Sequence, residues 1–232
     1  MNTEKIHLQN DLAAKVIVPN NKKESYEPSI TDYIFSFDIQ YENNLGYVAI
    51  DIVKYPNVSV GTFTHRAAVT EEYQPGFFSF REGPLLLAAL DKLKADVTGV
   101  FSPSLLIVDG HGIAHPRKFG VASYLGVKTG FPTIGVGKRT LLKYDGVLAE
   151  ARGSTVPIYL NDEIVGKVLR TQDGTKPVFV SNGHKVDLDV ACEIALHFAP
   201  NYKNLDTIRR ADMAARAFAK GEMEEGFFKY EI

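Results

Sequence analysis

The sequence of 232 residues contains no tryptophan and a single cysteine, Cys192. One thiol excludes a disulfide framework and a cysteine-ligated zinc site, and it is typical of proteins from a reducing cytoplasm. Long apolar runs are also missing: a stretch such as residues 85–90 is far shorter than the ~18 residues that span a bilayer. Residues 1–12 are polar and of mixed charge, which does not fit a signal peptide. We therefore expect a cytoplasmic protein without a membrane segment.

Neither sign of charge dominates the chain, because 26 Lys and Arg residues face 28 Asp and Glu residues and the formal net charge is −2. Binding to nucleic acid would therefore depend on local clusters of Lys and Arg rather than on the overall charge. With 45% hydrophobic residues the chain can bury a sizeable core. We expect residues 1–232 to form a single domain.

The first third of the chain contains three stretches that are typical of strands. Residues 33–39 are rich in aromatic and β-branched side chains, and residues 47–54 and 59–69 follow after short turns. Residues 43–46, Asn-Asn-Leu-Gly, favour a hairpin because Asn and Gly adopt positive φ readily. These patterns predict an antiparallel meander.

The middle of the chain predicts a parallel βαβ unit. Residues 105–108 form a short apolar run typical of a strand buried on both faces, and residues 133–136 are expected to form a second short strand. A helix-like segment at 119–127 lies between them, so both strands should end at the same edge of the sheet. We therefore predict an α/β fold with a mixed sheet flanked by helices. Further strands are expected within 146–169 and at 178–180, and further helices at 4–16, 85–93, 188–198 and 207–220.

Three acidic residues occur where these elements begin or end. Asp38 lies near the end of the first strand, Asp109 directly follows the strand at 105–108, and Glu82 precedes the predicted helix start at Pro84. Oxygen ligands alone select hard cations such as Mg²⁺ or Mn²⁺, which support phosphodiester hydrolysis. Lys138, at the next strand end, could orient water or neutralise a phosphate. The alternative is that each acid caps a turn or helix on its own.

Three histidines and one tyrosine are further candidates. The spacing of His111 and His115 could suggest zinc, but the glycines beside His111 argue against a helix that presents both rings on one face. His115 and His184 are each interpreted as a phosphate contact or as a hydrogen-bonded structural residue. Tyr73 lies in a Pro-Gly turn, where it could wedge into a base stack or instead cover the core with the neighbouring phenylalanines.

Several long blocks resemble the endonuclease V family, the deoxyinosine 3′-endonucleases. They are YQPGFFSFREGP at 73–84, VDGHGIAHPRKFGVASYLG at 108–126 and FPTIGVGK at 131–138, with FDIQY around Asp38 and SNGHKVDLD around His184 as flanking blocks. The resemblance extends from about residue 33 to residue 215. The sequence around Tyr73 departs from the usual pattern in having Glu72 before it and Gln74 after it, and residues 209–212 retain only part of the family's C-terminal block.

The resemblance implies an RNase H-like fold and a set of site residues. The implied metal ligands are Asp38, Glu82 and Asp109, and Lys138 and His115 are the further implied catalytic residues. Tyr73 matches the wedge, and Gly110, Gly112, Gly135 and Gly137 match backbone that lines the base pocket or packs close to it. Candidate contacts to the nucleic-acid backbone are Arg117, Lys118, Lys128, Arg139, Arg209 and Arg210, with His184 as an additional substrate-binding candidate.

The activity implied by the resemblance is a Mg²⁺-dependent endonuclease, with Mn²⁺ as a substitute. It would hydrolyse the second phosphodiester bond on the 3′ side of deoxyinosine or inosine and leave 3′-hydroxyl and 5′-phosphate ends. The expected partner is DNA containing deoxyinosine, with inosine-containing RNA left open, and the expected state is a monomer. Two alternatives stand beside it: a structure-specific nuclease, and a noncatalytic module that binds inosine.

Overall fold

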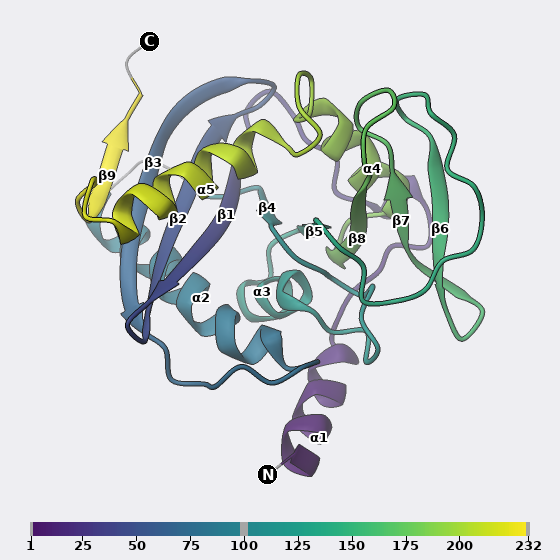
Figure 1. The fold of residues 1–232 in the computed structure, drawn as a ribbon, viewed down its shortest axis with the longest axis horizontal. Helices are drawn as coiled ribbons and strands as arrows, with labels where there is room; N and C mark the ends of the chain where they lie inside the picture. The colour runs from purple at the N-terminus through teal and green to yellow at the C-terminus, as the bar shows by residue number, and fades with distance from the viewer. Residues whose placement is uncertain (1, 98–101, 231–232) are drawn as a thin grey trace.

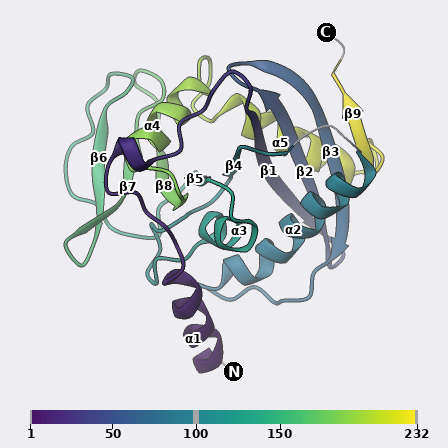
Figure 2. The same cartoon turned by 180° about the vertical axis from the view of Figure 1, so that it is seen from behind.

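The computed structural model describes residues 2–97 and 102–230, which form one nine-stranded mixed sheet with helices on both faces (Figures 1 and 2). The strand order is β6-β7-β8-β5-β4-β1-β2-β3-β9. The elements are α1 (Asn2–Ala13), η1 (Lys22–Glu24), β1 (Tyr33–Glu42), β2 (Leu45–Lys54), β3 (Val58–Ala68), α2 (Phe78–Asp96), β4 (Leu105–Val108), α3 (Val121–Thr129), β5 (Thr133–Gly137), β6 (Thr155–Leu160), β7 (Glu163–Leu169), β8 (Val178–His184), α4 (Leu188–His197), α5 (Asp206–Ala219) and β9 (Gly226–Lys229).

The predicted antiparallel meander and parallel unit are both confirmed. Strands β1, β2 and β3 pair antiparallel in sequence order, and β4 lies parallel to both β1 and β5. Asn43 and Asn44 have φ values of 49° and 61° at the turn between β1 and β2. These left-handed conformations match the twist of the hairpin strands, so the dipeptide fixes the first turn of the meander.

The centre of the sheet is apolar on both faces, because consecutive side chains of a strand point to opposite sides. In β4, Leu105 and Ile107 pack into a cluster with α4 and α5, whereas Leu106 and Val108 pack into a second cluster with α2 and α3. All four side chains are buried. The short continuous apolar run in the sequence is therefore a doubly covered central strand. Its rigid end positions the residue that follows it.

Helix α2 begins earlier than the sequence predicted. It starts at Phe78, which places Glu82 in its second turn and Pro84 inside the helix instead of at its entrance. Phe80 packs edge-to-face on Tyr124, with ring centroids 6.1 Å apart, so the aromatic stretch extends the buried face of the helix towards its N-terminus. The turn expected at Pro75 and Gly76 is present, and the helix begins two residues after it.

The strand boundaries differ from the expectations in two other places. Strand β8 continues to His184 instead of ending near residue 180, because residues 181–184 pair with β5. Residues 226–229 of the C-terminal tail form β9, which pairs with β3 (Figure 1). Residues 231–232, the end of the same tail, lie outside the described residues. Within residues 2–97 and 102–230, no helix combines the length and apolar character that crossing a membrane requires.

Candidate active site

Two acidic residues meet where the parallel pairing of β1 with β4 ends: Asp38 lies inside β1, which continues to Glu42, and Asp109 directly follows β4. Phe37 pairs with Val108 in the register of these strands, so the residues that follow them, Asp38 and Asp109, are neighbours. Asp38 is only 8% exposed because the sheet and its covering helices surround it. The two carboxylates therefore converge as predicted, but Asp38 does so from the interior of β1 and not from near its end, because the hairpin with β2 extends β1 to Glu42.

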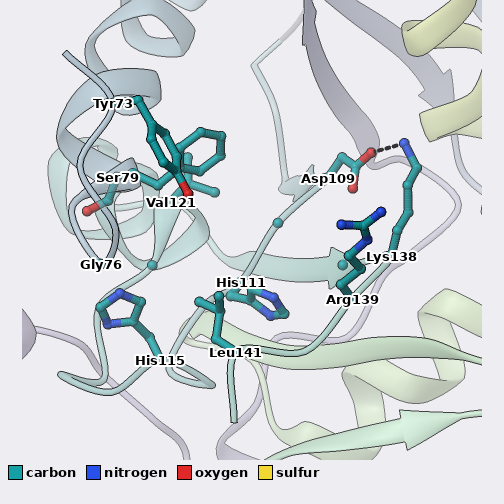
Figure 3. Close-up of a pocket in the computed structure, with 14 residues that line it drawn as sticks. Tyr73, Gly76, Ser79, Asp109, His111, His115, Val121, Lys138, Arg139 and Leu141 are labelled. Carbon is teal, nitrogen blue, oxygen red and sulfur yellow. Dashed lines mark ion pairs between the residues drawn. The ribbon is translucent and has the colours of Figure 1, made fainter. Parts of the chain in front are cut away.

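Lys138 comes from the end of the adjacent strand β5. Its Nζ lies 2.5 Å from Oδ2 of Asp109, and Figure 3 shows the two side chains pointing towards each other. Burial favours a lower pKa for Lys138, but Asp109, Asp38 and Asp212 together outweigh burial and raise it. The side chain is therefore an ammonium group that neutralises part of the acidic edge.

Glu82 reaches the same edge from α2 and is 5% exposed. The Tyr41 hydroxyl donates a hydrogen bond to Oε1 of Glu82 at 3.2 Å. Burial raises the pKa of Glu82 well above its ordinary value, and repulsion from Asp38 and Asp109 adds to the rise. The carboxylate is thus held in position by a neutral partner and remains electrostatically unfavourable.

Asp212 on α5 is a fourth acid that the sequence analysis did not select. The amide of Gln40 donates to Oδ2 of Asp38 and to Oδ1 of Asp212, both at 3.3 Å. Asp212 also accepts a hydrogen bond from Nε of Arg216 at 2.9 Å. In the sequence, Asp212 directly follows Ala211, which belongs to the apolar face of an amphipathic helix. This pattern indicates that the Asp212 side chain lies at the border of the core. The sequence alone did not show which strand that side chain meets.

These groups line one cavity of about 260 Å³, which we call the acidic cavity. The pKa of Asp38 is raised to about 8 by burial and by repulsion from Asp109 and Asp212, against the opposing effect of Lys138. An all-oxygen donor set under mutual repulsion fits a hard divalent cation. In the described parts of the chain, however, no three Asp, Glu, His or Cys side chains already form the ligand shell of one ion. Asp38 and Asp212 share the Gln40 amide, Glu82 accepts from Tyr41, and Asp109 pairs with Lys138, so the three acids expected from the sequence line one cavity, each beside a hydrogen-bond or ion-pair partner.

A second cavity of about 330 Å³ adjoins the first and shares Phe78, Asp109 and Lys138 with it. We call it the Tyr73 cavity. Figure 3 shows Tyr73 and His115 on one side and Asp109 with Lys138 on the other. Tyr73 is 64% exposed, and its ring packs edge-to-face on Phe78 at 6.2 Å. This exposure excludes the alternative in which Tyr73 covers the core.

The four glycines named from the sequence divide into two pairs. Gly110 and Gly137 line the Tyr73 cavity. Gly112 and Gly135 lie in packing contacts instead: a Cβ on Gly112 would come within 1.8 Å of the Asn182 carbonyl oxygen, and one on Gly135 within 2.6 Å of that of Gly110. The second pair therefore allows the loop after β4 to lie directly on the sheet, and the first pair exposes backbone to the cavity at two points of its wall.

Both histidines of the loop after β4 also line the Tyr73 cavity. His115 is 3% exposed, and its Nδ1 accepts a hydrogen bond from the Arg117 backbone N–H at 3.1 Å. Burial, assisted by the Arg117 charge, lowers the pKa of His115 to about 4. Burial also lowers the pKa of His111. The cavity therefore presents two neutral imidazoles at neutral pH.

Most of the basic residues proposed as backbone contacts have structural partners. The Arg117 guanidinium lies over the Phe77 ring and donates to the Gly76 carbonyl at 2.5 Å. Lys118 pairs with Glu163, and Lys128 lies over the Tyr124 ring. Arg210 binds Asp51 through two hydrogen bonds. Of the six candidates, Arg139 lines the Tyr73 cavity, and Arg209 lies on the outer side of α5 against Tyr202.

His184 is not brought to either cavity. Strand β8 is antiparallel to β5, and His184 pairs with Thr133 at the start of β5, whereas the acidic edge follows Gly137 at its end. The His184 ring is buried, and its Nδ1 accepts a hydrogen bond from the Ile17 backbone at 3.1 Å. This placement favours the structural interpretation of His184 over a substrate contact.

Buried acids and a lysine at one edge of a mixed sheet, beside a pocket with an exposed tyrosine, form an arrangement that suits metal-assisted hydrolysis of phosphodiesters. The sequence profile of the family described as Endonuclease V matches residues 10–213. Endonuclease V of Streptomyces avermitilis is 41% identical over 217 residues, which cover 92% of this chain and 90% of that protein, and the Nostoc punctiforme protein is 37% identical over 92% and 93%. The chain therefore belongs to the endonuclease V family.

Solved structures agree with the sequence comparison. The crystal structure of the S. avermitilis endonuclease V has a TM-score of 0.85 at 38% identity and covers 96% of this chain and 94% of its own. Ciona intestinalis endonuclease V, solved in complex with a 24mer DNA containing an inosine followed by a ribo-adenosine, has a TM-score of 0.82 at 26% identity and covers 95% and 98%. Family membership and fold together make this protein a nuclease.

Proposed function

We propose that the protein is a metal-dependent endonuclease that captures a deaminated purine nucleotide and hydrolyses the second phosphodiester bond on its 3′ side. The observation that carries the proposal is the pair of adjoining cavities. The Tyr73 cavity is lined by glycine backbone and by mainly uncharged side chains, with Asp109, Lys138 and Arg139 as its charged groups, and the acidic cavity beside it shares Asp109 and Lys138 with it. A base in the first cavity would place a phosphate on its 3′ side at the second.

The residues that would hold Mg²⁺, or Mn²⁺ in its place, are Asp38, Glu82, Asp109 and Asp212. When bound, such an ion supplies Lewis-acid stabilisation of the charge that develops during phosphodiester hydrolysis. For Asp109 to serve as a ligand, its carboxylate would turn from the Lys138 ammonium, which is then free to contact phosphate. Lys138 thus has two roles, as the counter-ion of Asp109 in the free protein and as a phosphate contact in the complex.

Recognition of the lesion would fall to Tyr73 and the walls of its cavity. The exposed ring stands on Phe78, so it can enter a base stack in place of the extruded nucleotide. Gly110 and Gly137 leave the backbone open to the edge of the base. Because burial lowers the pKa of His111 and of His115, both rings would meet the base as neutral imidazoles, each able to donate or accept one hydrogen bond.

The Ciona relative supports inosine as the target, since it was solved with inosine-containing DNA. We carry this substrate to the present protein because the same fold and an open pocket of base size occur here. We keep DNA containing deoxyinosine as the first substrate and inosine-containing RNA as the second. The protein is proposed to act as a monomer in the cytoplasm.

The first experiment is cleavage of matched DNA and RNA strands that carry one inosine, with Mg²⁺, against EDTA and Asp38→Ala controls. Cutting at the second bond 3′ to inosine, lost in both controls, is the expected result, and the faster strand identifies the substrate. Equal cutting of a branched duplex without inosine would favour the structure-specific nuclease. Inosine binding without cutting by the parent protein would favour the binding module.

The wedge role of Tyr73 is tested by Tyr73→Ala with Tyr73→Phe as its matched control. Loss of base stacking is worth about 1–3 kcal/mol, so Tyr73→Ala should weaken inosine-strand binding by about tenfold. The phenylalanine variant keeps the ring and should bind as the parent does. Equal affinity of the alanine variant and the parent would contradict the assignment.

A further inference from the structure

The outer face of α5 carries a stripe of residues that the fold does not use for packing. Ile208, Ala211 and Ala215 are fully buried against the sheet. Arg209, Met213 and Arg216 are spaced by four and three residues, so they lie in one row on the opposite side of the helix. We call this row the α5 stripe. Figure 1 shows α5 crossing one face of the sheet with its outer side uncovered by other elements.

The stripe begins at the acidic cavity. Arg216 lines that cavity together with Asp212, and its side chain is 59% exposed. Met213 comes next in the row and is 64% exposed. Its apolar side chain is therefore open to solvent between Arg209 and Arg216. The row therefore continues the cavity onto the surface as an alternation of positive and apolar side chains.

The stripe ends at a stacked pair. The Arg209 guanidinium lies over the Tyr202 ring at 3.7 Å from its centroid, and Tyr202 is 50% exposed. An arginine held flat on an exposed aromatic ring keeps its N–H groups available at its edge for phosphate oxygens, while the ring offers a surface for a base. Such combinations of cation and aromatic surface are typical of sites for single-stranded nucleic acid.

The order of the two cavities gives the strand a direction, an argument that rests on the proposed function. If the base occupies the Tyr73 cavity and the bond to be cut lies in the acidic cavity, the strand runs 5′ to 3′ from the first to the second. Gln40, Asp212 and Arg216 line the acidic cavity and are absent from the lining of the Tyr73 cavity. We propose that the α5 stripe, with Tyr202, binds the segment of single-stranded nucleic acid on the 3′ side of the cut.

Charge decides which way this segment turns along α5. Beyond the C-terminal end of the helix the chain carries Glu222, Glu224 and Glu225, which would repel phosphates. Towards the N-terminal end it carries Arg209 and the neighbouring Lys203. Seven residues of helix separate Arg209 from Arg216, about 10 Å, or about three nucleotides at the phosphate spacing of a B-form strand. The stripe should therefore affect only substrates whose 3′ arm extends several nucleotides past the cut.

The test measures kcat/KM on inosine strands that share one 5′ arm. Their 3′ arms extend either about two or about ten nucleotides past the cut. Arg209→Gln removes the charge of the stacked pair. Lys220→Gln is the matched control, since it removes a charge from the end of α5 beside the acidic tail. A mirrored set of strands varies the 5′ arm at a constant 3′ arm. Circular dichroism and urea unfolding confirm that both variants fold.

Arg209→Gln is expected to lower the preference for the long 3′ arm about fivefold and to reduce the salt dependence on that substrate by about one unit of the log-log slope. Lys220→Gln should leave both values as in the parent. The inference is overturned if Arg209→Gln lowers kcat/KM equally for substrates with short and long 3′ arms, or does not change kcat/KM at all. It is also overturned if the loss of kcat/KM depends on the length of the 5′ arm instead of the 3′ arm. Failure of the parent to cut any inosine strand would contradict the proposed function instead.

Discussion

Two groups of buried carboxylates lie beside α5, and they differ in what neutralises them. Asp51 on β2 is fully buried, and it accepts hydrogen bonds from Arg210 at 2.9 and 2.8 Å and from the Tyr230 hydroxyl at 2.8 Å. Asp38 on β1 is buried almost as deeply, but its hydrogen-bond partner is the neutral amide of Gln40. The first acid is satisfied by the fold. The second remains under repulsion that a bound cation would relieve, which is the difference between a structural and a functional carboxylate.

The largest expected effect follows from removing a functional carboxylate. Asp38→Asn should lower the rate of inosine-strand cleavage by about a thousandfold or more, because a catalytic metal contributes several kcal/mol to transition-state stabilisation. The same change should leave the free energy of unfolding equal or higher, since burial and repulsion from Asp109 and Asp212 already disfavour the charged form of Asp38 and raise its pKa to about 8. Single-turnover cleavage and urea unfolding measure the two quantities. A variant that loses stability and activity together would place Asp38 with the structural acids.

The opposite result is expected for the structural carboxylate. Asp51→Asn leaves the Arg210 charge without its ion pair, so the free energy of unfolding should fall by about 3 kcal/mol. Cleavage per folded molecule should change by less than about tenfold, since Asp51 lines neither cavity. Urea unfolding with Arg210→Gln and the double variant completes a cycle that isolates the pair. Additive single effects would show that the two residues do not stabilise each other.

The residues of the acidic cavity that directly follow strands could be predicted from the sequence. Asp109 follows a four-residue apolar run, Lys138 follows the short strand that comes next in the chain, and parallel strands joined by a helix end at one edge of the sheet. The βαβ connection between two successive strands therefore determines that Asp109 and Lys138 are neighbours in space. The hairpin at Asn43 and Asn44 was predictable for the same reason, since local residue preference and final conformation agree.

The rest depended on contacts between segments distant in the chain. Asp212 meets Asp38 through Gln40, across more than 170 residues of sequence, and the helical pattern of α5 alone does not show which strand it crosses. His184 occurs in a block that resembles functional sequence, yet the antiparallel direction of β8 carries it to the far end of β5. The direction of a strand and the placement of a helix depend on tertiary contacts. The residue pattern therefore did not show which side chains lie next to Asp212 and His184 in the fold.

His115 is a third buried titratable group, and burial keeps its imidazole in the deprotonated, neutral form. Because burial lowers its folded pKa to about 4 from an ordinary 6.5, the unfolded chain binds the proton more tightly. The contribution of His115 to stability is therefore complete above about pH 6.5 and is lost as the pH falls towards 4, by up to about 3 kcal/mol. Urea unfolding of the parent and of His115→Gln between pH 7.5 and pH 4.5 should show a steeper loss for the parent. Parallel pH profiles would show that His115 titrates normally in the folded protein.

The smallest expected effect concerns Glu82, the functional acid with a tyrosine partner. Tyr41→Phe removes the hydroxyl that donates to Oε1 of Glu82 and keeps the ring, over which Arg81 lies at 4.6 Å. The free energy of unfolding should fall by about 1 kcal/mol, the usual value of one hydrogen bond. The Mg²⁺ concentration for half-maximal cleavage should rise several-fold, because the carboxylate is no longer held towards the cavity. Tyr159→Phe, on an exposed tyrosine of β6, is the matched control and should change neither quantity. An unchanged Mg²⁺ requirement in Tyr41→Phe would reduce Tyr41 to a packing role and leave Glu82 positioned by α2 alone.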